Sequence, residues 1–139
     1  MNKRIGFTCG TFDLFHAGHV VMLREAKQHC DYLIVGIQID PSVDRKEKNK
    51  PGQSIIERQI QVGGCRFVDE TIVYATEKDL IILLQTLPVD VRILGSEYKP
   101  ATFTGSDLPI EIVFNRREHT FSSTALRDRV FLAENGKHT

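Results

Sequence analysis

Short apolar runs alternate along the chain with longer stretches in which the apolar residues follow a helical period. The short runs predict five strands, at residues 4–9, 32–39, 70–74, 91–94 and 110–114. The longer stretches predict four helices, at residues 18–30, 54–65, 77–87 and 122–132. Nearly every residue of 32–39 is apolar, which is typical of a strand buried on both faces of a parallel sheet. The alternation therefore predicts an α/β fold, a Rossmann-like doubly wound five-stranded parallel sheet.

Composition narrows the class of protein. The 139 residues fit one domain, with residues 134–139 expected to form a frayed tail. Lysine plus arginine and aspartate plus glutamate both number 18, so no basic excess favours nucleic acid as a partner. The longest apolar run, Leu80 to Leu84, is far below the roughly 20 residues that cross a bilayer. With no secretion signal and three cysteines that form no CxxC pair, the sequence predicts a soluble cytoplasmic protein without a membrane partner.

The segment after the first predicted strand is the first place to look for chemistry, because open parallel sheets bind ligands at the carboxyl ends of their strands. Residues 10–19 read GTFDLFHAGH. One interpretation is a turn with two surface histidines. The other is a phosphate site, in which Gly18 admits the ligand and His16 and His19 donate hydrogen bonds beside a helix N-terminus. Zinc is disfavoured because no third ligand stands at a suitable spacing.

The same ten residues resemble the H-x-G-H segment of the cytidylyltransferase-like nucleotidyltransferase superfamily. Residues 117–124, REHTFSST, are similar to a second segment of that superfamily, R-T-E-G-I-S-T-T, and keep its arginine and its hydroxyl cluster. The resemblance implies that His16, His19 and Arg117 are catalytic. It implies a nucleotide site formed by Gly10, Thr11, Phe12, Gly18, Ser122, Ser123 and Thr124. An ordinary Ser/Thr helix cap is the alternative interpretation of the last three.

Two further segments resemble cytidylyltransferases for choline, ethanolamine and glycerol phosphates. Residues 65–70, CRFVDE, are similar to their C-R-Y-V-D-E segment, which implies that Arg66 and Asp69 bind the nucleotide. The polar loop 44–52 resembles a lysine-rich loop of the glycerol-phosphate enzymes that reaches the phosphates of both substrates. On that basis Lys46 is expected to be catalytic, and a solvated surface loop is the alternative interpretation. Acceptor-binding roles are expected for Asp13, Lys48 and Arg58.

Residues 94–100, LGSEYKP, instead resemble the G-G-D-Y-K-P stretch of heptose-phosphate adenylyltransferases, with Gly95 expected at the nucleotide. The leading hypothesis is transfer of CMP from CTP to glycerol 3-phosphate, giving CDP-glycerol and pyrophosphate. The alternatives are an adenylyltransferase for a sugar phosphate such as heptose 1-phosphate, and a non-catalytic nucleotide sensor. The family's chemistry implies Mg²⁺ carried by the triphosphate, with no metal site made by the protein, and a homodimer.

Overall fold

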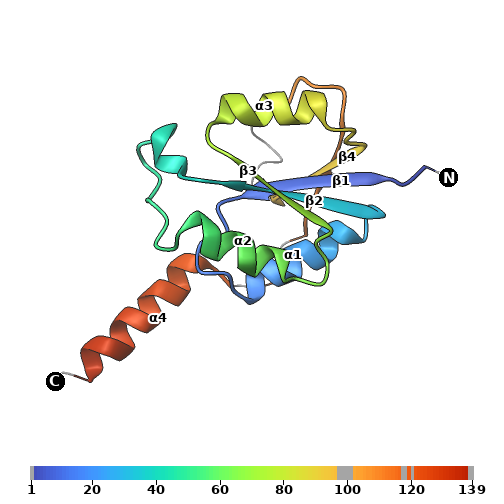
Figure 1. Ribbon diagram of the computed structural model, residues 1–139. Coiled ribbons are helices and arrows are strands. Elements are labelled where there is room, and N and C mark those ends of the chain that lie inside the picture. The colour runs from blue at the N-terminus through green and yellow to red at the C-terminus, as the bar shows by residue number, and fades with distance from the viewer. Residues whose placement is uncertain (1, 97–101, 117–118, 120, 138–139) are drawn as a thin grey trace.

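The structure is a computed structural model that describes residues 2–96, 102–116, 119 and 121–137. Five parallel strands form one sheet in the order β3-β2-β1-β4-β5. The strands are β1 (Ile5–Gly10), β2 (Tyr32–Gln38), β3 (Glu70–Tyr74), β4 (Val91–Leu94) and β5 (Glu111–Phe114). Helices α1 (Ala17–Lys27) and α2 (Ile55–Gly63) lie on one face of the sheet, and α3 (Glu77–Thr86) lies on the other (Figure 1). The predicted doubly wound α/β fold is confirmed.

Each face of the sheet has its own apolar core. On the side of α1 and α2, Leu33, Val35 and Ile37 of β2 pack with Leu23 and Val62. On the side of α3, Phe7 and Ile34 pack with Tyr74, Leu80 and Leu84. Successive β2 residues therefore point to opposite cores, which is why nearly every position of this strand is apolar.

Local sequence signals place the helix starts. Ser54 accepts a hydrogen bond from the Glu57 N–H while the Glu57 carboxylate accepts one from Ser54, so the predicted capping box is present. Helix α4 (Ser123–Gly136) runs away from the body of the domain and buries none of its side chains (Figure 1). Residues 134–136 are thus helical where the sequence predicts a frayed tail. No helix in the described ranges has the length and apolarity needed to span a membrane.

The strand order fixes where a ligand can bind. After β1 the chain builds β2 and then β3 to one side of β1, and it crosses to the other side to form β4 and β5. The direction of winding reverses between β1 and β4, so their carboxyl ends leave a crevice between the loops that follow them. Gly10 ends β1 and Leu94 ends β4, and the segment 10–19 begins at this crevice.

Candidate active site

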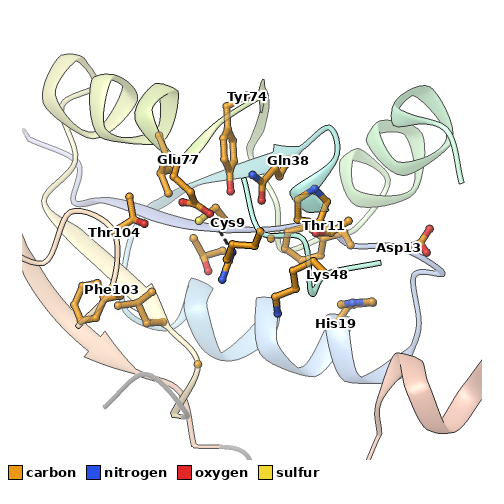
Figure 2. Close-up of a pocket in the computed structure, with 18 of the residues that line it drawn as sticks. Cys9, Thr11, Asp13, His19, Gln38, Lys48, Tyr74, Glu77, Phe103 and Thr104 are labelled. Atoms are coloured by element: carbon orange, nitrogen blue, oxygen red, sulfur yellow. Dashed lines mark hydrogen bonds and ion pairs between the residues drawn. The ribbon is translucent and has the colours of Figure 1, made fainter. Parts of the chain in front are cut away.

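A pocket of about 670 Å³ occupies the crevice at the carboxyl ends of β1 and β4. We call it the large pocket. Among the predicted site residues, its lining includes Gly10, Thr11, Phe12, Asp13, His19, Lys48, Gly95 and Ser123. Figure 2 shows His19 and Lys48 on the α1 side of β1, with Tyr74, Glu77 and Gln38 on the α3 side. The structure thus brings residues from five separate segments of the chain to one cavity.

The two histidines of the segment 10–19 are held in a defined orientation at the start of α1. The Gly18 N–H donates to His16 Nδ1 at 3.0 Å, and the His16 N–H donates to His19 Nδ1 at 3.1 Å. Since Nδ1 accepts in both rings, the hydrogen-bond pattern assigns the proton of each neutral imidazole to Nε2. His16 Nε2 lies 3.1 Å from Ser123 Oγ, which ties α1 to the first turn of α4.

His19 is neutral at physiological pH. Burial, and then the neighbouring His16, lower the pKa of His19 to about 4. The rings of Phe12 and Phe15 lie with their centroids 5.4 Å from that of His19, which explains the loss of water around it. A neutral ring with its proton on Nε2 is a hydrogen-bond donor, and it lies at a helix N-terminus, where backbone N–H groups also favour an anion. This arrangement fits the predicted phosphate site rather than a turn with two surface histidines.

The tight packing around the histidines explains one of the glycines. A Cβ added at Gly18 would lie 2.8 Å from His16 Cε1 and 3.1 Å from Phe121 Cβ. A larger residue there would displace the imidazole that caps α1. Gly18 is also part of the lining of a second cavity of about 290 Å³, which we call the small pocket. His16, His19 and Ser123 line it as well, so the two histidines stand where the two pockets meet.

Asp13 fixes the loops around the site. Its carboxylate accepts hydrogen bonds from the N–H groups of Gly52 and Gln53, both at 2.9 Å, and pairs with Arg127 of α4. Burial alone would raise the pKa of Asp13, but these hydrogen bonds and Arg127 outweigh it and hold the pKa below its usual value. With its oxygens so engaged, Asp13 positions the segments that form the large pocket.

Arg58 has a similar structural environment. It is only 2% exposed, and its guanidinium donates to five backbone carbonyls, those of Thr11, Gln38, Ile39, Gln53 and Ser54, at 2.6 to 3.3 Å. These bonds join the ends of β1 and β2 to the start of α2. The acceptor-binding role expected for Arg58 has no support in these contacts, because the described hydrogen bonds all go to backbone carbonyls.

Four other predicted residues are not gathered at the pockets. Arg66 is exposed and stacks on Phe67, with its Cζ 5.1 Å from the ring centroid. Asp69 pairs with Lys27 and accepts from the Leu33 N–H, at the amino end of β2 and β3, which is the opposite edge of the sheet. Lys46 and Thr124 are exposed and line neither pocket. Arg117 lies outside the described residues.

The remaining predicted residues lie close to the site. Ser122 is the N-cap of α4, where its side chain accepts from the Ala125 N–H at 3.1 Å, and it lines the small pocket. The helix-cap interpretation of Ser122 is therefore correct, and a role at a ligand is compatible with it. Of the segment 94–100, Gly95 lines both pockets, whereas residues 97–100 lie outside the described residues.

The structure also shows residues that the sequence analysis missed. Arg92 of β4 lines the large pocket on the α3 side, near Cys9, Tyr74 and Glu77. Asn115, the first residue after β5, lines the small pocket. One signal for each was present: an arginine inside an otherwise apolar buried strand, and an amide at the carboxyl end of a strand.

Arg92 is buried without a carboxylate partner among the described residues. It is 3% exposed, its Nη1 donates to the Thr104 carbonyl, and its Cζ lies 5.4 Å from the centroid of the Phe103 ring. Its Nε is buried and makes no hydrogen bond to any residue within the described ranges. A buried cation with an unused donor at a cavity wall is a binding group for an anion.

The described residues hold no group of three or more His, Cys, Asp or Glu side chains that could bind a metal ion. The donor set suits a metal ion that arrives with its own phosphate ligands, since Mg²⁺ commonly keeps water and substrate phosphates in its coordination shell. The Mg²⁺ expected from the sequence thus stays a prediction, as do the homodimer and the cytoplasmic location.

Comparison with known proteins agrees with this geometry. Residues 7–129 match the family model described as cytidylyltransferase-like. The bifunctional protein HldE of Rhodospirillum rubrum is 42% identical over 106 residues, which cover 76% of this chain and 21% of that protein. HldE of Campylobacter jejuni is 32% identical over 130 residues, or 93% of this chain and 28% of that protein. The chain thus spans about a quarter of the length of these relatives.

Two solved structures have the same fold. A lipopolysaccharide core biosynthesis protein from Thermoplasma volcanium superimposes with a TM-score of 0.71 at 22% identity, covering 85% of this chain and all of that one. A bifunctional NMN adenylyltransferase/ADP ribose pyrophosphatase from Francisella tularensis, complexed with AMP and a manganese ion, superimposes with a TM-score of 0.61 at 17% identity. That match covers 92% of this chain and 41% of the other.

Proposed function

The chain belongs to the cytidylyltransferase-like family of nucleotidyltransferases, and from that premise we propose that it transfers the adenylyl group of ATP to the phosphate of a sugar phosphate such as heptose 1-phosphate. The observation that carries the proposed reaction is the histidine pair. Two imidazoles with Nε2 protons stand at the N-terminus of α1, where the two pockets meet. Such donors match the negative charge that develops on an α-phosphate during substitution.

The proposed reaction needs no covalent intermediate. An oxygen of the acceptor phosphate attacks the α-phosphorus of the triphosphate, the bond to the bridging oxygen of the β-phosphate breaks, and pyrophosphate leaves with that electron pair. His16 and His19 donate hydrogen bonds to the five-coordinate phosphorus group. Lys48 and Ser123, both in the large pocket, are placed to neutralise and orient the remaining phosphates. Mg²⁺ bound to the triphosphate supplies further charge neutralisation. Catalysis then consists of alignment and electrostatic stabilisation.

The α3 side of the large pocket supports a phosphorylated, hydroxylated acceptor. Arg92 offers a buried cation, and Gln38, Glu77 and Thr104 offer polar groups on the same side of β1 (Figure 2). Arg45, from the loop after β2, pairs with Glu77 at 3.0 Å and keeps that carboxylate at the pocket wall. Carboxylate and amide groups beside a cation suit the hydroxyls of a sugar phosphate.

ATP and a sugar phosphate are chosen over CTP and glycerol 3-phosphate on two grounds. The curated relatives at 42% and 32% identity are HldE proteins, and the segment 94–100 resembles heptose-phosphate adenylyltransferases. The segment that favours the cytidylyltransferase alternative, residues 65–70, lies at the opposite edge of the sheet from the histidines. CDP-glycerol synthesis, which the sequence analysis ranks first, becomes the second candidate.

The test is pyrophosphate release with Mg²⁺ present, measured for ATP and CTP with heptose 1-phosphate and with glycerol 3-phosphate. We expect release with ATP and heptose 1-phosphate, and a decrease in kcat of roughly 10²- to 10³-fold in His19→Ala, the scale for one lost transition-state donor. His29→Ala, two residues beyond the C-terminal end of α1, is the matched control and should keep full activity. Release with CTP and glycerol 3-phosphate alone would reverse the choice of substrates. Unchanged kcat in His19→Ala would remove the histidine pair from the mechanism.

A further inference from the structure

We propose that the side-chain amide of Asn115 binds the base of the nucleotide, with one hydrogen bond donated and one accepted, and that the base is adenine. The proposal rests on the nucleotidyl transfer proposed above and names the residue that recognises the nucleoside. It comes from a polar group that the free protein leaves unused. This residue was not among those predicted from the sequence, although an amide at the carboxyl end of a strand was visible there.

Asn115 is 6% exposed, yet neither Oδ1 nor Nδ2 has a hydrogen-bond partner in the part of the chain that the structure describes. Its backbone is fixed, since its N–H donates to the Leu94 carbonyl at 2.7 Å and so extends the pairing of β5 with β4. A rigid backbone presents the amide in one place, while the side chain makes no bond that would have to be broken. Buried amides without partners are rare in folded proteins because they lose their hydrogen bonds to water. A ligand that pairs with both atoms would explain why this one is retained.

The position of Asn115 matches the place where a nucleoside has to lie. Asn115 lines the small pocket together with His16, His19, Gly95 and Ser123. His19, Gly95 and Ser123 line the large pocket too. A nucleotide whose α-phosphate contacts the histidines can therefore direct its nucleoside into the small pocket. Its triphosphate and the acceptor then share the large pocket.

The small pocket has the surface that a base needs. Phe121 is 48% exposed and forms part of the wall, and its ring stacks on that of His119 with the centroids 5.1 Å apart. A purine could extend this stack. Met22 and Val21 of α1 add apolar surface. Glu25 also lines the small pocket. Its carboxylate accepts a hydrogen bond from the Arg116 backbone N–H at 2.7 Å, so one of its oxygens already has a partner. Among the described residues of this lining, Asn115 is the one whose buried side-chain nitrogen and oxygen both lack a hydrogen-bond partner.

The amide also matches the chemistry of adenine. An asparagine side chain presents one acceptor beside one donor. The amino group of adenine and the ring nitrogen next to it offer the complementary pair, which is how asparagine reads adenine in other nucleic-acid contexts. Removing the amino group from the base would leave Oδ1 of Asn115 without a partner, whichever edge of adenine it faces.

The experiment compares dissociation constants of four probes. They are ATP, CTP, purine riboside 5′-triphosphate, which lacks the amino group of adenine, and inorganic tripolyphosphate, which lacks the nucleoside. We expect Asn115→Leu to weaken ATP binding roughly 10- to 100-fold and to leave tripolyphosphate unchanged. The wild-type preference for ATP over purine riboside triphosphate should fall to near unity in the variant. Asn115→Ala is a second variant with a smaller side chain, and Asn135→Leu, on the exposed face of α4, is the control.

Thermal unfolding of the free proteins separates binding from folding. Replacing an unpaired buried amide by leucine removes an unmet hydrogen-bonding requirement, so Asn115→Leu should unfold at the same or a higher temperature than wild type. A variant that binds ATP like wild type, or keeps the preference for ATP over purine riboside triphosphate, overturns the assignment of Asn115 and leaves nucleotidyl transfer standing. Tighter wild-type binding of CTP than of ATP overturns the choice of adenine. A wild-type protein that binds neither ATP nor tripolyphosphate overturns the proposed function as well.

Discussion

Two buried arginines, Arg58 at the start of α2 and Arg92 in β4, are nearly equal in exposure, at 2% and 3%. Their surroundings differ. The Arg58 guanidinium donates five hydrogen bonds to backbone carbonyls at the ends of β1 and β2 and the start of α2. Arg92 donates one hydrogen bond to a backbone carbonyl, that of Thr104, and interacts with the Cys9 thiol. Its Nε is buried and has no partner among the described residues, and Arg92 lines the large pocket.

The contrast shows that burial of a charge does not identify a binding residue. A buried cation whose donors are all used by the protein holds the fold together, and a ligand would have to compete with those bonds. A buried cation with unused donors at a cavity gains its partners only when an anion binds. Arg58 belongs to the first kind and Arg92 to the second. Resemblance pointed to Arg58 as an acceptor-binding residue, and the contacts in the structure point to Arg92.

The largest effect is expected for Arg58→Met. The change leaves five backbone carbonyls, including the buried one of Gln38, without the Arg58 donor, at about 1–3 kcal/mol for a carbonyl that water does not reach. We expect the free energy of unfolding to fall by roughly 3–5 kcal/mol, measured by denaturant titration with circular dichroism. Arg58→Lys keeps the positive charge and an ammonium group with three N–H donors, so it should lose less stability. A variant as stable as wild type would mean that the carbonyls find water, and Arg58 would no longer differ from Arg92.

Arg92→Met should have the opposite profile. Because the guanidinium donates to one backbone carbonyl, interacts with the Cys9 thiol and forms no ion pair among the described residues, stability should stay within about 1 kcal/mol of wild type. Loss of charge-assisted hydrogen bonds to the acceptor should raise the KM for the sugar phosphate roughly 10- to 100-fold. The dissociation constant for ATP should not change. Arg129→Met, on exposed α4, is the control for removing one positive charge.

Steady-state kinetics at varied acceptor concentration, together with unfolding curves, test whether Arg92 binds the acceptor or stabilises the fold. An unchanged KM together with a large loss of stability would place Arg92 with Arg58 as a structural residue. A large rise in the Kd for ATP would instead move Arg92 to the nucleotide side of the site.

The smallest effect is expected for a third arginine. Arg66 is exposed near the amino end of β3, where it stacks on Phe67. The resemblance of residues 65–70 to cytidylyltransferases nevertheless implies that Arg66 binds the nucleotide. From its position we expect Arg66→Ala to change stability by less than about 0.5 kcal/mol. We expect the affinities for ATP and CTP to change by less than about twofold, measured by titration calorimetry. A clear loss of nucleotide affinity would support the implied role and would require the nucleotide to reach the opposite edge of the sheet.

Strand and helix positions were largely predictable because local signals decide them. The predicted strands 70–74 and 91–94 coincide with β3 and β4, and Ser54 and Glu57 form the capping box expected from their spacing. The end of the last helix was less predictable. Helix α4 buries no side chain, so its apolar residues at Val130, Phe131 and Leu132 carry no periodic burial signal.

The sequence by itself determined the class of fold and the segment at the centre of the site. Apolar periodicity fixes which residues face a core. His16, Gly18 and His19 lie within one turn of the start of α1, so their arrangement is local. Tertiary structure alone decided which distant residues join them. Arg92 and Asn115 reach the site because β4 and β5 cross to the far side of β1, and Arg58 is removed from it because carbonyls distant in sequence converge on its guanidinium. The positions of these residues depend on the strand order and on which distant groups their side chains can bond with. Neither is a local property of the chain.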